Sequence, residues 1–151
     1  MLAMANATNR LGYVALMCTA LWWGGLTALG LVFVPGLFLW WPEKAVAGTF
    51  AGHLFKLHAW MSMALVVALL VIDRIQAWKS QQLSQTGAVW SMRLALALIV
   101  LQELWIAPHI MARDNLALWH NLGSVALLGQ WILATRHLHA LWRQQGAAEA
   151  H

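Results

Sequence analysis

The strongest constraint in this sequence is a long run of apolar residues without a charge. Residues 11–34 contain no Asp, Glu, Lys or Arg. At about 1.5 Å per residue, this segment can cross the roughly 30 Å hydrocarbon core of a membrane with some tilt. Three further apolar segments follow, at about residues 53–75, 87–107 and 116–135. We therefore predict an all-α fold over residues 1–151, a single transmembrane domain that forms an integral membrane four-helix bundle.

Composition favours a membrane protein over a soluble one. Hydrophobic residues make up 62% of the chain and charged residues only 9%, whereas soluble domains carry about 25% charged residues. The net charge of +4 comes from basic residues at the ends of apolar segments and not from a basic run. It therefore indicates orientation in a membrane, and no nucleic-acid partner is expected. The single cysteine, Cys18, excludes a disulfide within the chain and a thiolate metal cage.

Helix ends are predicted from prolines and polar segments. Pro35 with Gly36 is expected to end the first helix, and the third helix is expected to stop before Pro108. The second helix, at about residues 43–78, is longer than one crossing, so its first turns should project at the periplasmic side. Residues 79–86 are expected to form a solvated linker, and residues 146–151 a disordered tail.

The distribution of basic residues predicts the orientation. Most of them fall at one side of the predicted bundle and few at the other, and the side richer in Lys and Arg is normally cytoplasmic. We therefore expect a multi-pass protein of the bacterial inner (cytoplasmic) membrane with both termini in the cytoplasm. The first group comprises Arg10, Arg74, Lys79, Arg93, Arg136 and Arg143, and the second comprises Lys44 and Arg113.

Polar side chains from three helices are predicted to meet in the outer half of the membrane. A charged side chain at the bilayer centre costs at least about 2.5–3.5 kcal/mol, so such groups usually face the bundle and find partners. We expect a Lys56–Glu103 pair with His120 and Asn121 nearby, and Ser124 shares a helix face with His120. The predicted polar pocket therefore comprises Lys56, Glu103, His120, Asn121 and Ser124.

Structural interpretations of the same residues stay open. Near a helix end, Lys56 can extend its ammonium group to the interface, and His120 with Ser124 can simply form a helix–helix hydrogen bond. The small residues Ala20, Gly24 and Ala28 lie at four-residue spacing. Such spacing lets a second helix approach closely, so we expect packing inside the bundle, with a homodimer contact as the alternative.

Three histidines are candidate metal or haem ligands. His53 and His58 are five residues apart, so they should point in different directions and form no clamp on one helix. A site would need one of them to meet His120 across the bundle. Neutral imidazole suits copper, zinc and haem iron, so haem b and copper are the cofactors considered.

Several short motifs resemble a known family when they are taken in order. They are Trp23-Gly24-Gly25-Leu26, Phe33-Val34-Pro35, Glu103 with Pro108, and His120-Asn121-Leu122-Gly123-Ser124. Over about residues 11–133, the chain resembles a bacterial domain-of-unknown-function membrane family related to eukaryotic transmembrane protein 205. The resemblance implies a small four-helix membrane architecture, with Pro35, Pro108, His120 and Ser124 as signature positions. The Trp-Gly-Gly-Leu stretch is also similar to copper-resistance D-type membrane proteins.

The leading hypothesis is a non-enzymatic protein that binds or passes a small solute or metal ion. An accessory subunit of a larger membrane complex, or a homo-oligomer, is the other version, and a cluster packed without a cavity would favour it. The alternative is a haem-b-binding membrane redox protein with His58 or His53 and His120 as axial ligands. An enzyme is not favoured, because no motif pairs a nucleophile with a base.

Overall fold

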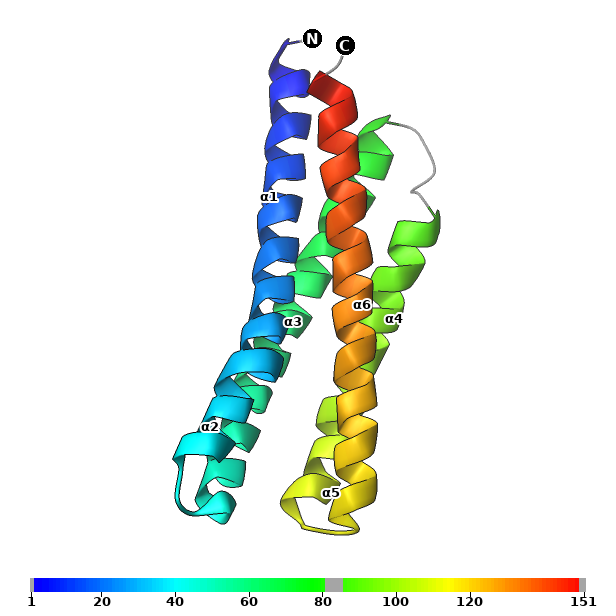
Figure 1. The fold of residues 1–151 in the computed structure, drawn as a ribbon. Helices are drawn as coiled ribbons and strands as arrows, with labels where there is room; N and C mark the ends of the chain where they lie inside the picture. The colour runs from blue at the N-terminus through cyan, green and yellow to red at the C-terminus, as the bar shows by residue number, and fades with distance from the viewer. Residues whose placement is uncertain (1, 81–85, 150–151) are drawn as a thin grey trace.

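The computed structural model describes residues 2–80 and 86–149, which fold into four long helical rods (Figure 1). The first rod consists of α1 (Leu2–Thr27), the π-helical turn η1 (Ala28–Phe33) and α2 (Val34–Trp40). The second is α3 (Lys44–Ser80). The third consists of α4 (Thr86–Leu101), the π-helical turn η2 (Gln102–Ile106) and α5 (Ala107–Met111), and the fourth is α6 (Leu116–Glu149).

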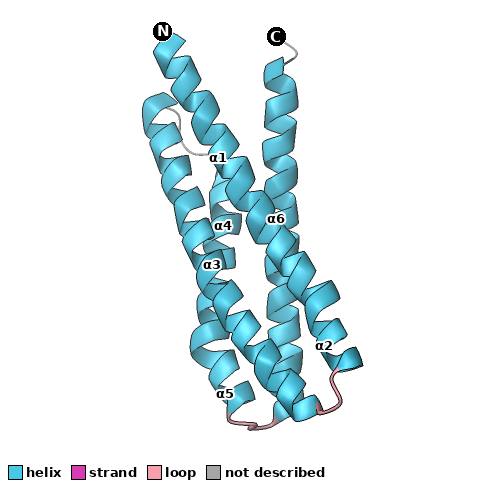
Figure 2. Cartoon of the chain, turned by 90° about the vertical axis from the view of Figure 1, so that its left-hand side faces the viewer, coloured by secondary structure: helices cyan, strands magenta, loops and turns pink. Residues whose placement is uncertain are grey.

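The four rods form a closed ring. Each packs against the next one along the chain, and α6 also packs against α1. Successive rods run in opposite directions, so α1 begins and α6 ends at the same end of the bundle (Figures 1 and 2). We call the opposite end, which holds the turns at residues 41–43 and 112–115, the loop end.

The ring has an apolar core made from one face of each rod. Its fully buried side chains include Trp22, Val66, Met92 and Ile99. Many large apolar side chains lie on the outside instead, for example Val71 and Val125 at 52% and 68% exposure. An apolar exterior of this kind is typical of a protein that lies in a membrane.

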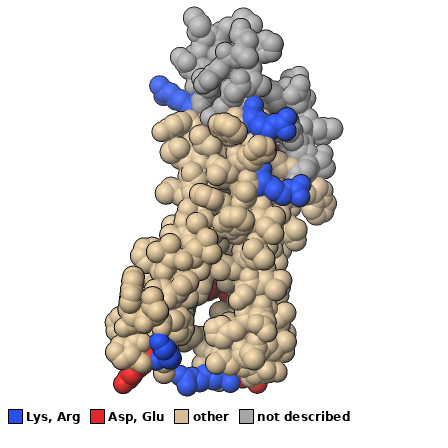
Figure 3. All heavy atoms as spheres, in the orientation of Figure 1, with Lys and Arg blue, Asp and Glu red and all other residues tan. Residues whose placement is uncertain are grey.

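Three of the described helical segments are long and apolar enough to cross a membrane: Arg10–Trp40, Lys44–Lys79 and Ala88–Met111. The more polar α6 is not among them, although it packs along both α1 and α4. In Figure 3, the Lys and Arg side chains gather toward the two ends of the face shown and leave a band free of them between.

The two helix ends predicted from prolines are wrong. Both rods continue past the proline, to Trp40 and to Met111. Pro35 and Pro108 each occupy the second residue of a short α-helix that directly follows a π-helical turn. A proline inside a helix lacks an N–H and its ring clashes with the carbonyl four residues earlier. The wider π turn before it relieves that clash, so the rod bends and continues.

Of the remaining boundaries, the start of the first helix differs most, because α1 begins at Leu2 and not near residue 11. The helix α3 covers Lys44–Ser80 against a predicted 43–78, and residues 81–85 of the predicted linker lie outside the described residues. Where a disordered tail is predicted from residue 146, α6 continues to Glu149. Ala147, Ala148 and Glu149 are good helix formers, which outweigh Gly146. Residues 150 and 151 lie outside the described residues.

The bundle opens toward the loop end. There, the rod with α2 leans away from α6, while α2 stays against α3 and α5 stays against α6. Figure 3 shows a hollow between these two halves, with acidic atoms visible deep inside it. We call this hollow, between α2 on one side and α5 with α6 on the other, the loop-end opening.

Candidate functional site

The loop-end opening stops where two tryptophans and two threonines join α1 to α6. Trp23 Nε1 donates to Thr135 Oγ1 at 2.9 Å, and Trp131 Nε1 donates to Thr27 Oγ1 at 3.0 Å. Each threonine hydroxyl in turn donates to the carbonyl of the tryptophan four residues earlier on its own helix, at 2.8 Å. We call these four residues the Trp–Thr clasp. It holds α1 to α6 up to Thr27, the residue before η1.

Both π turns lie at the same level, directly beside the clasp. On η2, Gln102 Oε1 accepts a hydrogen bond of 2.9 Å from Nε2 of the buried Gln130 on α6. On η1, a Cβ atom added to Gly30 would lie 3.6 Å from Leu127 of α6. Leu127 and Gln130 are less than one helical turn apart, so η1 and η2 flank the same stretch of α6.

Glu103 follows Gln102 on η2 and is half-buried. The charge that acts on its carboxylate is the ammonium group of Lys56 on α3. The two groups are therefore electrostatic neighbours, but within the described chain no ion pair of 4.0 Å or less joins them. Lys56 itself is exposed. Among the described residues, Glu103 thus has a cation nearby but no direct ionic partner.

His120 and Ser124 face the opening from α6. Leu127 and Trp131, each seven residues further along, approach α1 at Gly30 and Thr27. Because seven residues are almost two full turns, His120 and Ser124 lie on that same flank. Both are exposed, since α2 has diverged from α6 at their level. The Ser124 hydroxyl donates to the carbonyl of His120 at 2.9 Å.

The predicted pocket residues therefore lie at two depths and on more than one face. Gly123 packs against Ile106 and Ile110, so His120 lies nearer the mouth of the opening than Glu103 does. Asn121 is rotated by about 100° from His120. It lies exposed on a different flank of α6, away from the opening. The structure brings Glu103, His120 and Ser124 to the opening in this way, and it leaves Asn121 out.

A buried polar pair that the sequence prediction missed lies on α3. His58 Nε2 is 3.1 Å from the hydroxyl of Ser62, which is completely buried. A Cβ atom on Gly25 would lie 2.6 Å from His58 Cε1, so the imidazole lies directly against the backbone of α1. The spacing of four residues between His58 and Ser62 was the signal in the sequence that could have found the pair.

The three candidate haem ligands do not converge. His53 lines a separate pocket beside Arg113, whereas His58 packs against α1 beside Gly25. Gly25 lies close to the level of Trp131, and His120 precedes Trp131 by eleven residues, about 16 Å along the helix. A pair of axial ligands must face one iron from opposite sides, so His58 and His120 do not fit that role. The described residues also contain no group of three His, Cys, Asp or Glu side chains that could hold a metal ion.

The small residues of α1 face two ways. Around Gly24 no atom lies within 4 Å of an added Cβ, so its surface is open and the predicted packing inside the bundle is wrong for this residue. Ala20 and Ala28 lie four residues on either side and share this outward face, roughly opposite the buried Trp22 and Leu26. The close approach of helices occurs instead at Gly25, which the spacing pattern passes over.

Comparison with known proteins gives one result. No curated protein and no solved structure matches the chain, so the expected relationships to eukaryotic transmembrane protein 205 and to copper-resistance D-type proteins stay predictions. Residues 17–117 match a family described as a domain of unknown function, DUF4149. The match includes both π turns and Glu103 and ends in the first turn of α6, before His120. Because it covers more than half of the 151 residues, the chain belongs to the DUF4149 family.

Proposed function

We propose that this protein binds a small organic cation in the loop-end opening, with Glu103 as the counter-ion. One observation carries the proposal: the Glu103 carboxylate lies half-buried on a π turn, close to Lys56 but without an ion pair to it. An ionisable group at this depth is costly unless it has a partner. An incoming cation would supply that partner, and Lys56 would compensate the charge of Glu103 while the site is empty.

The backbone around Glu103 supports a binding role. π-Helical turns inside α-helices occur frequently at functional sites, because the extra residue turns a side chain away from its regular position. Here two such turns lie at one level of the bundle and flank the opening. The Gln102–Gln130 hydrogen bond fixes η2 to α6, so the neighbouring Glu103 is held in a defined place.

The surroundings favour an organic cation over a metal ion. Divalent metals need several hard or imidazole ligands around one point, and the described residues hold no group of three His, Cys, Asp or Glu side chains that includes Glu103. The rings of Trp23 and Trp131, with centroids 6.3 Å apart, lie just beyond the π turns. Aromatic faces beside a carboxylate are the usual environment for an alkylated or protonated amine.

The membrane setting is part of the same proposal. The four rods would cross the bacterial inner membrane with both termini in the cytoplasm and the loop end toward the periplasm. The alternation of rod directions and the excess of basic residues at the end where α1 begins support this orientation. The helix α6 would cross with the others, because it packs along α1 and α4.

A titration of tryptophan fluorescence tests the binding. Purified protein in detergent would be titrated with benzylammonium and with tetraethylammonium, and a saturable change is expected for at least one of them. Glu103→Gln should weaken that binding about tenfold or more, because a hydrogen bond or contact to a charged group contributes roughly 1.5–3 kcal/mol. Lys56→Met should tighten it, since the internal competitor is gone.

Glu43→Gln is the matched control, because Glu43 is an exposed glutamate in the turn between α2 and α3. It should bind like the unmodified protein. Equal affinity of the Glu103→Gln variant and the unmodified protein would remove the proposal. The accessory-subunit or homo-oligomer alternative would then rest on the open face of α1 at Ala20, Gly24 and Ala28.

A further inference from the structure

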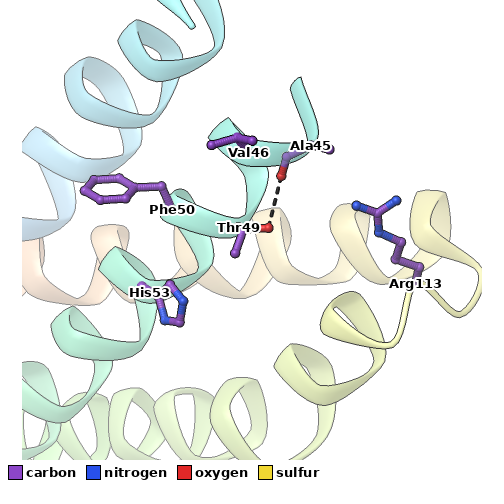
Figure 4. A pocket seen from close by; sticks show the side chains of 6 residues that line it. All are labelled: Ala45, Val46, Thr49, Phe50, His53 and Arg113. Atoms are coloured by element: carbon purple, nitrogen blue, oxygen red, sulfur yellow. Dashed lines mark hydrogen bonds between the residues drawn. The ribbon is translucent and has the colours of Figure 1, made fainter. Parts of the chain in front are cut away.

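A second pocket lies outside the bundle, at the loop end. It is a cavity of about 310 Å³ between the first turns of α3 and the turn that joins α5 to α6. Its lining consists of Ala45, Val46, Thr49, Phe50, His53 and Arg113 (Figure 4). In this lining, Phe50 lies on α3 about a quarter-turn from the buried Ala51 and His58, and the other α3 residues lie on the opposite side of that helix. The cavity is therefore separate from the loop-end opening.

The lining is divided into a cationic part and an apolar part. In Figure 4 the guanidinium group of Arg113 points from its turn toward α3, and the His53 ring and the Phe50 ring lie along the same helix. The hydroxyl of Thr49 donates to the carbonyl of Ala45 at 3.0 Å. Its proton is therefore committed, and the charged donor directed at the cavity is Arg113.

Arg113 has no carboxylate partner within 4.0 Å in the described chain. The neighbouring Asp114 pairs instead with His109, at 4.0 Å. The other nearby basic residue, Lys44, is engaged with the carbonyls of Phe38 and Trp41. Arg113 thus presents an uncompensated positive charge to a cavity whose other walls are largely apolar.

The backbone places Arg113 in an unusual conformation. Its φ of 57° and the φ of 35° at Asn115 lie in the left-handed region, which residues other than glycine adopt rarely. The turn is held in this shape by backbone hydrogen bonds from Arg113 to Ile110 and from Asp114 to His109, each 3.1 Å. A glycine would adopt the same turn without strain. The chain instead has an arginine at this position and bears the conformational cost of its positive φ.

We propose that this cavity binds the phosphate headgroup of an anionic membrane phospholipid. A planar guanidinium group forms two parallel hydrogen bonds to a phosphate, which a lysine cannot match. Val46 and Phe50 would contact the glycerol and the first part of the acyl chains. Trp41 stacks on Phe50, with centroids 6.3 Å apart, and tryptophans in such positions typically lie at the membrane–water interface. A lipid headgroup would therefore meet the cavity at the depth where phosphates are found.

Native mass spectrometry of the full-length protein in detergent tests this proposal. The probes are dihexanoyl phosphatidylglycerol, dihexanoylglycerol without a phosphate, and inorganic phosphate. We expect one tightly retained phosphatidylglycerol, no retained dihexanoylglycerol, and displacement of the lipid only at a large excess of inorganic phosphate. Arg113→Gln should weaken lipid binding about tenfold or more. The affinity of Arg113→Lys should lie between those of the unmodified protein and the Gln variant, because lysine keeps the charge and loses the second hydrogen bond.

The matched control is Arg10→Gln, an exposed arginine on α1 far from the loop end, which should bind the lipid normally. The melting temperature of each variant would show that it is folded. If Arg113→Gln does not fold, the binding of Arg113→Lys tests the site in its place. Unchanged phosphatidylglycerol binding in the Arg113 variants would overturn the site. Equal binding of inorganic phosphate and lipid would overturn the lipid as its occupant.

Discussion

Gly24 and Gly25 are neighbours on α1, but they meet different surroundings. A Cβ atom on Gly25 would come within 2.6 Å of His58 Cε1 and 3.1 Å of Met61, whereas Gly24 faces open space. His58 is also held by Ser62 and so cannot easily move away. The pair shows how a one-residue step along a helix decides between close packing and the outer surface.

We expect Gly25→Ala to lower the free energy of unfolding by about 1–3 kcal/mol, because overpacking forces side chains or helices apart. Gly24→Ala should be neutral or should raise it by up to about 1 kcal/mol, since alanine favours the helix. Unfolding by sodium dodecyl sulfate in mixed micelles, followed by circular dichroism, measures both. Equal effects of the two substitutions would contradict the packing of His58 against Gly25.

His137 gives the fold a pH dependence. It lies beyond the predicted crossing of α6, is only 7% exposed, and its Nδ1 atom has no hydrogen-bond partner among the residues that the structure describes. Burial lowers the pKa of His137, and the nearby charge of Asp73 opposes this shift. The unfolded chain takes up the proton near pH 6.5, at the ordinary pKa of histidine. Between that pH and the lowered folded pKa the unfolded state binds more protons, so stability should fall as the pH drops below about 6.5.

The measurement is the melting temperature at pH 7.5 and at pH 5.5. His137→Gln should reduce the loss of stability at the lower pH, because the group that must be protonated is gone. His139→Gln, at an exposed position two residues further along, should leave the loss unchanged. A pH profile that is the same in all three proteins would show that His137 does not contribute.

At the scale of the elements, the Trp–Thr clasp joins α1 and α6 at the point where the bundle begins to open. Removal of a threonine hydroxyl leaves a part-buried indole N–H of the opposite helix without its partner. Thr27→Val and Thr135→Val should each cost about 0.6–2 kcal/mol of the free energy of unfolding. Thr49→Val is the control, because its hydroxyl also donates to a carbonyl of its own helix but lies outside the clasp. Combining Thr135→Val with Trp23→Phe should cost less than the sum of the single changes.

The π turns and prolines belong to the same scale. Considered with its local sequence alone, each of Pro35 and Pro108 is expected to end a helix, because proline lacks the N–H that continues the helical hydrogen bonds. In the structure each follows a π turn, and the rod that contains it stays packed on its neighbours, α2 on α3 and α5 on α6. Packing compensates for the hydrogen bond that the proline removes. The residues around each proline do not predict this packing, because it depends on the neighbouring rods.

For the whole molecule, the number of crossings is the decisive question, because α6 is less apolar than the other three rods. Four crossings would place the α5–α6 turn and the end of α6 on opposite sides of the membrane. In a Cys18→Ala background, Ala112→Cys should react with a membrane-impermeant maleimide from the periplasmic side. Gln144→Cys should react only after the inner membrane is broken. Labelling of both cysteines from the same side would mean that α6 does not cross.

Local sequence is enough to establish that the chain is helical and where its long apolar segments lie. It also predicted the start of α6 at Leu116 and both ends of α3 to within two residues. These features depend on local properties: lipid leaves no partner for an unpaired backbone group, so an apolar run of this length must form a helix. The placement of Glu103 near Lys56 also follows from depth along two neighbouring helices.

The rotation of each rod and the position of its bend are set by packing between the rods, which the folded structure reveals. Spacing along one helix could not show that Gly25 faces His58 while Gly24 faces outward, or that His58 and His120 lie at different depths. The Arg113 cavity likewise joins the start of α3 to a turn some sixty residues later in the chain. Helix rotation and bending depend on which surfaces of neighbouring rods fit together, and that fit is a property of all four rods at once.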